Sequence, residues 1–323
     1  MVDSICDDAD PRPRVGISAC LLGRAVRYDG GHKCDRFLHD ALSQHLQWLP
    51  VCPEVEIGLG TPREAIRLVQ LEGETRLQGS RSGEDHTDRM ASYIEQRMPE
   101  LHSQRLRGFV LKKDSPSCGM QRVRVYTNAT VSRDGRGMFA AALLKAFPNL
   151  PIEEEGRLCD ARLRENWVER VFAYDDLCQL WNSDWTIGDL IEFHSRYKLT
   201  LLAHSQHEYR HLGRLVAQAK DVSRSRLRIT YEATFMSALT RISTRRTNTN
   251  VLQHMAGFFK RQLDGTSRAE LADHIEDYRA GFVSLTVPLT LIRHFVNSLN
   301  VRYLAEQTFL NPHPKDLALR NYV

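Results

Sequence analysis

The sequence has no long hydrophobic run, and this absence limits where the protein is expected to work. No stretch of about 18 apolar residues occurs in the 323-residue chain, so no membrane span is expected. The opening segment, MVDSICDDADPRPR, is acidic and then rich in Pro and Arg, and it lacks the apolar core of a secretion signal. We therefore expect a cytoplasmic protein whose residues 1–13 form a flexible tail.

Paired cysteine motifs are also missing, because no two cysteines are separated by only two residues. Structural zinc sites commonly use such pairs, so this kind of site is not indicated. The chain nevertheless contains seven cysteines, an odd number in a sequence without a secretion signal. This favours free thiols, metal ligands or a redox role over a disulfide framework. Internal repeats and low-complexity tracts are absent as well.

Charge is distributed unevenly along the chain, although the net charge is only +4. Residues 191–323 carry 19 Lys and Arg against 11 Asp and Glu, a balance of +8, whereas residues 1–190 carry 25 against 29, a balance of −4. Such asymmetry predicts two modules, of which the second meets a polyanion. The alternative is a solvated helix face without a partner.

The pattern of apolar residues predicts an α/β protein followed by a helical part. In the first half, strand-like runs at 14–23, 48–60 and 106–119 alternate with helical patterns near 35–46, 87–104 and 137–147. This order predicts a Rossmann-like, mostly parallel sheet with helices on both faces. A long helix over 157–181 closes it, and successive helices follow. We expect a boundary at 183–187, which gives domains over 14–183 and 187–323.

Three cysteines follow the three strand-like runs. Cys20 comes after VGISA, Cys52 after WLPV, and Cys118 after FVLKK in the stretch LKKDSPSCG. Ligands of open α/β sheets gather at the carboxyl ends of the strands, so neighbouring strands would bring the three thiols to one edge. Each cysteine also adjoins turn residues, which expose the sulfur and backbone N–H groups. The sequence therefore predicts a shared site.

The four other cysteines are weaker candidates as ligands. Cys159 and Cys178 fall in the long helical pattern, where burial is expected, and Cys6 lies in the tail. Cys34, in YDGGHKCDRF, is the one competitor as a fourth ligand. Three cysteines with a vacant fourth position fit an iron–sulfur cluster with one open iron. At this point the residues do not separate zinc from iron.

Several motifs together resemble a known family over most of the chain. ISACLLGRAVRYDGGHK, VCPEVEIGLGTPREAIRL, LKKDSPSCG and LRENWVERVFAY are similar to the thiouracil desulfidase (TudS-like) family. FHSRYKLTLLAHSQHEYRHLGRLVA, NVLQHMAGFFKRQL and PLTLIRHF resemble the YbgA-type helical domain that is often fused to it. Such fusions resemble desulfidases that convert 4-thiouridine in tRNA to uridine.

The resemblance implies a set of site residues. It implies a 4Fe–4S cluster held by Cys20, Cys52 and Cys118 with one iron open, and catalytic roles for Glu54 and Ser115. The chemistry agrees, because an open iron is a soft Lewis acid for a thiocarbonyl sulfur. Glu54 is two residues from a ligand and suits a general base for water. Alternatively Glu54 is a surface carboxylate or helix cap, and Ser115 only a turn former.

The basic second half is the candidate RNA-binding part. Tyr28, in the first half, is a possible stacking surface for the base. His207 and His211 have the spacing of a metal-binding pair, but no third ligand accompanies them. Phosphate contacts are expected from seven arginines, namely Arg210, Arg214, Arg224, Arg226, Arg228, Arg245 and Arg246.

The expected partner is tRNA that contains 4-thiouridine, and the sequence indicates neither a membrane nor an obligatory protein partner. Two alternatives are kept open. The first is a desulfidase of free thiouracil or thionucleosides, which uses the same chemistry. The second is a zinc-stabilised nucleic-acid-binding protein without catalysis, which also agrees with the charge and the cysteines.

Overall fold

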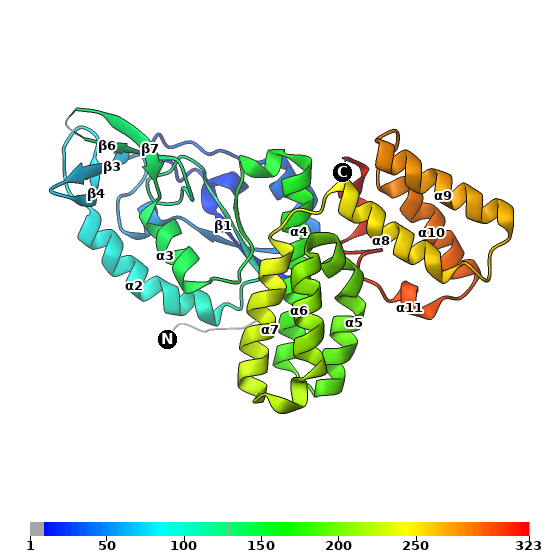
Figure 1. Cartoon of the computed structure of the whole chain (residues 1–323). Helices are drawn as coiled ribbons and strands as arrows, with labels where there is room; N and C mark the ends of the chain where they lie inside the picture. Colours follow the sequence, from blue (N-terminus) through cyan, green and yellow to red (C-terminus); the bar gives the residue numbers. More distant parts are fainter. Residues whose placement is uncertain (1–9, 128, 323) are drawn as a thin grey trace. The chain divides into compact units, whose positions relative to one another are not determined.

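The computed structural model describes residues 10–127 and 129–322, with the side chain of Tyr322 left aside (Figure 1). The chain divides into two compact units, residues 1–159 and 160–323. Cys6 and most of the expected tail lie outside the described residues. No helix in the described part combines the length and the apolar character that a membrane span requires.

The first unit is built on a four-stranded parallel sheet in the order β2-β1-β5-β8. The apolar runs form its strands because their side chains are buried, completely so in β5. Gly16 is required in this sheet, since a Cβ there would lie 2.2 Å from the ring of Phe109 on the neighbouring strand. The strand bounds are β1 Arg14–Ser18, β2 Gln47–Val51, β5 Gly108–Leu111 and β8 Ile152–Glu154.

A second sheet, in the order β4-β3-β6-β7, was not expected from the sequence. It is mixed, because β3 pairs with β4 antiparallel and with β6 parallel. Its inner side chains, among them Leu68, Leu77 and Val123, form a small core with Met90. The bounds are β3 Ile66–Leu71, β4 Glu74–Gly79, β6 Val123–Tyr126 and β7 Val131–Gly135.

Three α-helices complete the described part of the first unit: α1 Pro53–Glu56, α2 Thr87–Ser103 and α3 Met138–Ala146. Phe139 of α3 packs on Phe109 of β5 and on Tyr93 of α2, which places both helices against the strands. The helix expected near 35–46 is instead a π-helical turn at Phe37–Ala41 followed by a 3₁₀ turn at Leu42–Gln44. The prediction of a parallel sheet with helices is thus confirmed, as is the helical second half.

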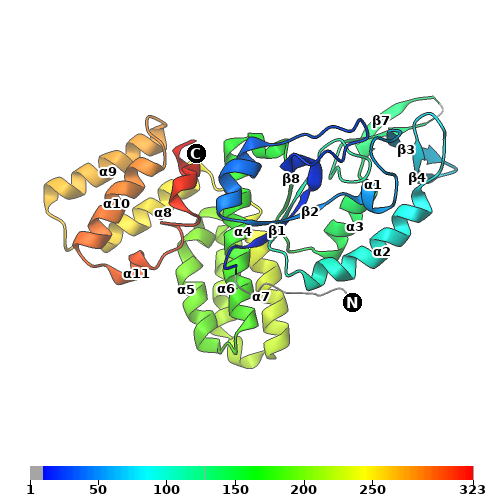
Figure 2. The same cartoon turned by 180° about the vertical axis from the view of Figure 1, so that it is seen from behind.

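The second unit begins with four long helices that lie side by side, as both views show (Figures 1 and 2). Their apolar faces bury one aromatic-rich core, in which Phe193, Tyr231 and Phe235 are in ring contact. Hydroxyl and carboxylate caps start each helix, with Asp160 and Ser205 as examples. The bounds are α4 Ala161–Asn182, α5 Ile187–His204, α6 Gln206–Ala217 and α7 Arg224–Leu239.

A second core follows, in which α5 is packed by the later helices. Leu202 of α5, Val251 of α8 and Ile292 of α10 are buried together there. The bounds are α8 Arg245–Phe258, α9 Gly265–Ala280, α10 Thr286–Ser298 and α11 Arg302–Ala305. Short 3₁₀ turns at Lys315–Leu317 and Leu319–Tyr322 follow α11.

The division between the units lies earlier than the expected boundary at 183–187. The long helix α4 is grouped with the helical unit because Ala173, Leu177 and Trp181 belong to the core of α5–α7. The sequence pattern showed that this helix exists, but it carried no information about which core its apolar face joins.

The helical unit also contains a buried ionic network. Glu165 and Glu169 lie one turn apart on α4, and both are buried. Arg320 Nε donates to Glu165 Oε1 at 2.9 Å, and His204 Nε2 lies 3.0 Å from Glu169 Oε2. Although burial alone would raise the pKa of Glu165, hydrogen bonding to His313 and the charge of Arg320 hold it well below its usual range. Each buried carboxylate therefore has its partner inside the unit.

Candidate functional site

The three predicted thiols meet at the carboxyl edge of the parallel sheet. Cys20 follows β1, Cys52 follows β2, and Cys118 lies in the turn after β5, and these three strands are neighbours. All three line one cavity of about 460 Å³. Cys20 and Cys118 are buried, at 9% and 6% exposed, and Cys52 is half-buried. The thiols are thus gathered, and their role as ligands stays a prediction.

Two glycines allow the turn of Cys118 to close tightly. A Cβ on Gly119 would lie 2.8 Å from the carbonyl oxygen of Ser115, and one on Gly137 would lie 2.5 Å from the carbonyl of Ser117. Backbone bonds run between the same segments, from Gly119 N to Ser115 O at 2.8 Å and from Gly137 N to Gly119 O at 2.8 Å. The start of α3 therefore holds the cysteine turn in place by direct backbone contact.

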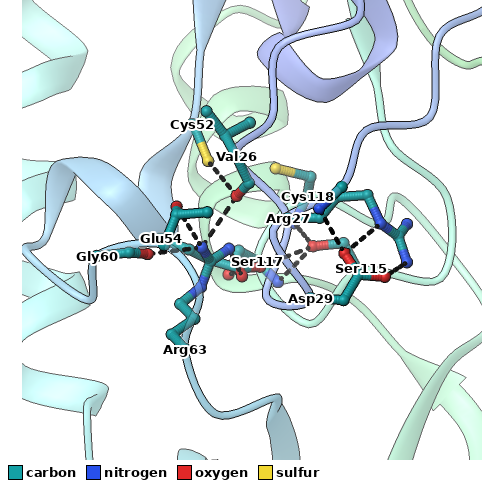
Figure 3. A network of polar contacts seen from close by, with 12 residues as sticks. Val26, Arg27, Asp29, Cys52, Glu54, Gly60, Arg63, Ser115, Ser117 and Cys118 are labelled. Atoms are coloured by element: carbon teal, nitrogen blue, oxygen red, sulfur yellow. Dashed lines mark hydrogen bonds and ion pairs between the residues drawn. The ribbon is translucent and has the colours of Figure 1, made fainter.

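Glu54 is fixed in the cavity by Arg63 (Figure 3). Arg63 Nη2 lies 2.6 Å from Glu54 Oε2, and the two side chains are only 5% and 15% exposed. Arg63 Nη1 donates to the carbonyl oxygens of Val26 and Gly60, each at 2.9 Å. The Sγ of Cys52 lies 3.9 Å from the same carbonyl of Val26. One guanidinium thus ties the carboxylate to two of the loops around the cavity.

Ser115 is oriented by the turn that carries it. Its Oγ accepts hydrogen bonds from the backbone N–H groups of Ser117 and Cys118, at 3.2 and 3.0 Å. These contacts occupy the lone pairs of the hydroxyl oxygen. The hydroxyl proton is therefore free to be donated to Glu54 Oε1, which lies 3.4 Å away. Ser117 is fully buried and donates to the same oxygen at 3.1 Å. Glu54 Oε1 therefore faces two hydroxyl groups, while Oε2 faces Arg63.

Burial governs the protonation of the three thiols in the chain alone. It raises the pKa of Cys20 to about 11, although Lys112 acts in the opposite direction. It also raises the pKa of Cys52, and it raises the pKa of Cys118 well above the usual range, where Glu54 adds to the effect. The thiols are therefore protonated at neutral pH unless a positively charged group replaces the protons.

A buried ion pair braces the segment between β5 and Cys118. Lys112 Nζ donates to Glu155 Oε1, and Lys113 N donates to Glu155 Oε2 at 2.7 Å. Glu155 follows β8, the strand next to β5, and it is 7% exposed. The two lysines line the cavity and follow an internal strand, so they do not protect a sheet edge. The brace holds both charges of the pair near Cys20, where Lys112 lowers the pKa of the thiol and Glu155 raises it.

Cys34, Cys159 and Cys178 do not line this cavity. Cys34 is exposed and is not among the lining residues. The expected burial of Cys159 is wrong, because this residue is exposed in the 3₁₀ turn before α4 and lies outside the helix. Cys178 is half-buried within α4. Tyr28 lines the cavity and is 44% exposed, with the Arg27 guanidinium 5.5 Å from its ring centre.

The seven arginines predicted to contact RNA lie on three helices of the second unit. Arg210 and Arg214 are exposed on α6, one turn apart. The others stand at the beginning of α7 and α8, where no acidic residue occupies the first turn. Three of these pack on rings, Arg224 on Trp185, Arg228 on Trp181 and Arg245 on Tyr278. Positive charge at a helix N-terminus opposes the helix dipole, so helix stability does not explain this placement.

The spaced histidines of α6 do not form a metal site with their neighbours. His207 and His211 both approach Glu208, at 3.0 and 3.4 Å. In residues 10–127 and 129–322, no three His, Cys, Asp or Glu side chains are gathered closely enough to hold a metal ion.

Two residues of the site were missed from the sequence. Arg63 lies in the motif VCPEVEIGLGTPREAIRL, which indicated roles only for Cys52 and Glu54, and Ser117 lies between Ser115 and Cys118. The Gly and Pro residues before Arg63 signalled a turn that could return the chain to Glu54. No comparable signal around Ser117 indicated that it would be buried.

The Arg63–Glu54 pair is expected to contribute strongly to the stability of the first unit. Replacing Arg63 by leucine leaves a carboxylate that is 15% exposed without its partner. We expect a loss of about 3 kcal/mol in unfolding free energy, and recovery of part of it in the double variant Arg63→Leu/Glu54→Gln. Urea denaturation of the variants measures both values.

An exposed pair is the matched control for this experiment. Arg76 and Glu74 lie 2.7 Å apart, but the side chains are 36% and 69% exposed, so Arg76→Leu should cost less than about 1 kcal/mol. Equal losses in the two single variants would contradict the special role of the Arg63–Glu54 pair.

Different known families match the two units of the chain. The sequence profile of 2-thiouracil desulfurase matches residues 15–155, and that of a protein family of unknown function, DUF1722, matches residues 198–314. The uncharacterised Escherichia coli protein YbgA is 35% identical over 161 residues, which are 50% of this chain and 95% of that protein. The uncharacterised Bacillus subtilis protein YbbK is 29% identical over 144 residues, 43% of this chain and 95% of that protein.

A solved structure also matches. It is described as a 4Fe–4S-dependent thiouracil desulfidase, TudS, and it shares 32% sequence identity. The match covers 46% of this chain and 94% of that chain, with a TM-score of 0.36.

Proposed function

This chain belongs to the YbgA family and carries a 2-thiouracil desulfurase domain in its first unit, and we propose that it is a desulfidase of 4-thiouridine in tRNA. The observation that supports this most directly is the cavity of about 460 Å³. It brings Cys20, Cys52 and Cys118 together with Glu54 and Ser115, a set that combines soft ligands with a carboxylate for acid–base work.

The three thiols fit a 4Fe–4S cluster with one open iron. They follow three neighbouring strands and line a common cavity, and cysteine thiolates are the ligands that hold iron–sulfur clusters. Cys20, Cys52 and Cys118 would hold the cluster. When bound, it supplies a soft Lewis acid that attracts the thiocarbonyl sulfur and makes its carbon more electrophilic.

Glu54 is suited to activate the water that replaces the sulfur. Its Oε2 is engaged by Arg63, so Oε1 is the oxygen that takes a proton from water. The hydroxyl of Ser115 lines the cavity beside Oε1, where it orients the water or passes the proton on. The reaction balances without a reductant, because the C=S bond is exchanged for C=O and one water supplies the oxygen and both protons of hydrogen sulfide.

The basic helices are the feature that favours tRNA over a free base. Arg224, Arg226 and Arg228 on α7, with Arg245 and Arg246 on α8, carry charge that the helix dipole opposes. Such charge is typical of contacts with phosphates, which position an RNA without reading its sequence. We therefore place the activity in the cytoplasm, where tRNA occurs. A desulfidase of free thiouracil or thionucleosides is the alternative that shares the same cavity.

Turnover of two substrates separates these functions. With anaerobically reconstituted protein, we expect tRNA containing 4-thiouridine to be desulfurated with a KM at least tenfold lower than that of free 4-thiouridine, because the phosphate contacts add affinity outside the cavity. The loss of the thiolated base and the release of sulfide measure the reaction. If only the free base or nucleoside is consumed, the small-molecule alternative is correct.

A further inference from the structure

A groove on the second unit has not been assigned any role. It runs between α5 and α6 and has a volume of about 1040 Å³. The α5 side is formed by Ile191, His194, Ser195 and Lys198, whose spacings of three and four residues place them on one helix face. On α6 the lining residues repeat with the same spacing, at Gln206, Tyr209, Arg210, Gly213, Arg214 and Ala217.

The groove carries positive charge that the protein does not neutralise. Lys198, Arg210 and Arg214 line it, and none of them has an ion-pair partner in the described part of the chain. No acidic residue is among the side chains that line the groove. His207 alone has a nearby carboxylate, that of Glu208. An anion in the groove would therefore meet three uncompensated cations.

His194 adds a directed hydrogen-bond donor to these charges. The residue is 9% exposed, and its Nδ1 lies 3.1 Å from the hydroxyl of Tyr231. Tyr231 is fully buried, so its hydroxyl proton is satisfied by donation to Nδ1, and the ring proton of His194 is then on Nε2. Burial, with Lys198 adding to it, lowers the pKa of His194 to about 4, which keeps the ring neutral. Nε2 has no partner among the described residues.

Gly213 is placed in the middle of α6 without a packing reason. A Cβ at this position would meet no atom within 4 Å, so the surrounding residues do not require glycine. Glycine in a helix interior costs about 1 kcal/mol relative to alanine. The open space it leaves is part of the groove floor, between Arg210 and Arg214.

We propose that the α5–α6 groove binds backbone phosphates of the RNA substrate, with Lys198, Arg210 and Arg214 as cationic contacts and His194 Nε2–H as a neutral donor. This assignment rests on the proposed function, and it identifies the α5–α6 groove as a surface that binds the RNA. Phosphate oxygens accept from cations and from neutral N–H donors alike. A protein partner is disfavoured, because interfaces of that kind have an apolar centre, and Ile191 is the one exposed large apolar side chain in this groove.

Filling the groove without removing charge is the sharpest test. Gly213→Gln should place a side chain in the open space and should not destabilise α6, since glutamine is a better helix former than glycine. We expect tRNA affinity of the full-length protein to fall at least tenfold, with unchanged or higher thermal stability. Gly257→Gln on α8 is the control, because a Cβ there also meets nothing within 4 Å. It should bind tRNA as the parent does.

Removing the charges provides the second arm. In Lys198→Gln/Arg214→Gln, two phosphate contacts are lost, so the slope of log affinity against log salt should become shallower by about 2. The control with the same change in net charge is Arg279→Gln/Arg302→Gln, whose arginines pair with Glu276 and Glu306. This control should lose at most about one unit of slope, because only long-range attraction is reduced. The affinity series runs from about 50 to 200 mM salt.

The outcomes separate the groove from the proposed function. If the groove variants bind tRNA as the parent does while the parent desulfurates it, the groove proposal is wrong and the function stands. If the groove variants lose tRNA binding but the parent never desulfurates tRNA, the groove is supported and the function is wrong. Inorganic phosphate is the third probe. If it stabilises the parent at low millimolar concentration without competing with tRNA, the groove is a small-anion site and the proposal is overturned.

Discussion

Replacing Cys52 by alanine is expected to remove most of the iron that the reconstituted protein binds. The three cavity thiols are the only protein anchors that the proposed cluster has, and each comes from a different strand end. Losing one leaves two irons without a protein ligand, so the cluster should be lost or strongly depleted. The same result is expected for Cys20→Ala and Cys118→Ala. Iron content and the broad absorbance near 400 nm measure it.

Two other cysteines serve as controls for this loss. Cys34 is exposed and does not line the cavity, and Cys178 is half-buried within α4. Alanine at either position should leave the iron content unchanged. Full iron retention in Cys52→Ala would rule out the proposed ligand set, and a colourless parent protein that binds zinc would support the alternative of a non-catalytic protein.

Replacing Glu54 by glutamine is expected to reduce kcat by about a hundredfold or more, with the iron retained. Glutamine keeps the shape of the side chain and can still accept from Ser115 and Ser117, but its amide cannot take a proton from water. All three cavity thiols are kept in this variant, so the protein should still bind iron as the parent does. Single-turnover desulfuration beside iron analysis separates the loss of chemistry from the loss of cofactor.

A second glutamate on the same helix gives the matched control. Glu56 accepts from Cys52 N and from the Tyr93 hydroxyl, both at 2.8 Å, and it does not line the cavity. Glu56→Gln should keep most of the turnover, because its amide oxygen can still accept from Cys52 N while its NH2 group donates to the Tyr93 hydroxyl oxygen. Ser115→Ala should retain iron and turn over more slowly. Normal turnover by Glu54→Gln would show that water is activated by another group.

The parts of the site that were predictable share one physical origin. Each of Cys20, Cys52 and Cys118 follows a buried apolar run, and parallel strands end at a common edge of the sheet. The local sequence pattern was therefore sufficient to predict that the three thiols lie together. Arg63 was not predictable in the same way, because its contact with Glu54 depends on the path of a loop. Periodicity identifies strands and helices, but it does not describe such a path.

The second sheet was missed although one signal was present. Leu71 and Glu74 are joined by Glu72 and Gly73, which have φ angles of 48° and 85°. A two-residue turn ending in glycine is typical of a tight hairpin, and here it links β3 and β4. The strands themselves carry charged residues on the outer face, which weakened the apolar pattern. Turn chemistry was therefore more informative here than hydrophobicity.

The buried pair of Glu165 and Arg320 affects the order in which the two units fold during synthesis. The two residues are 155 positions apart in the chain, so α4 leaves the ribosome well before Arg320 is synthesised. Until then the carboxylate of Glu165 lacks this counter-ion, and burying it is unfavourable. We expect the helical unit to close late, in one cooperative step, while the preceding unit folds first. The cysteine cavity could then receive its metal while the chain is still being synthesised, before the helical unit that is proposed to bind RNA has folded.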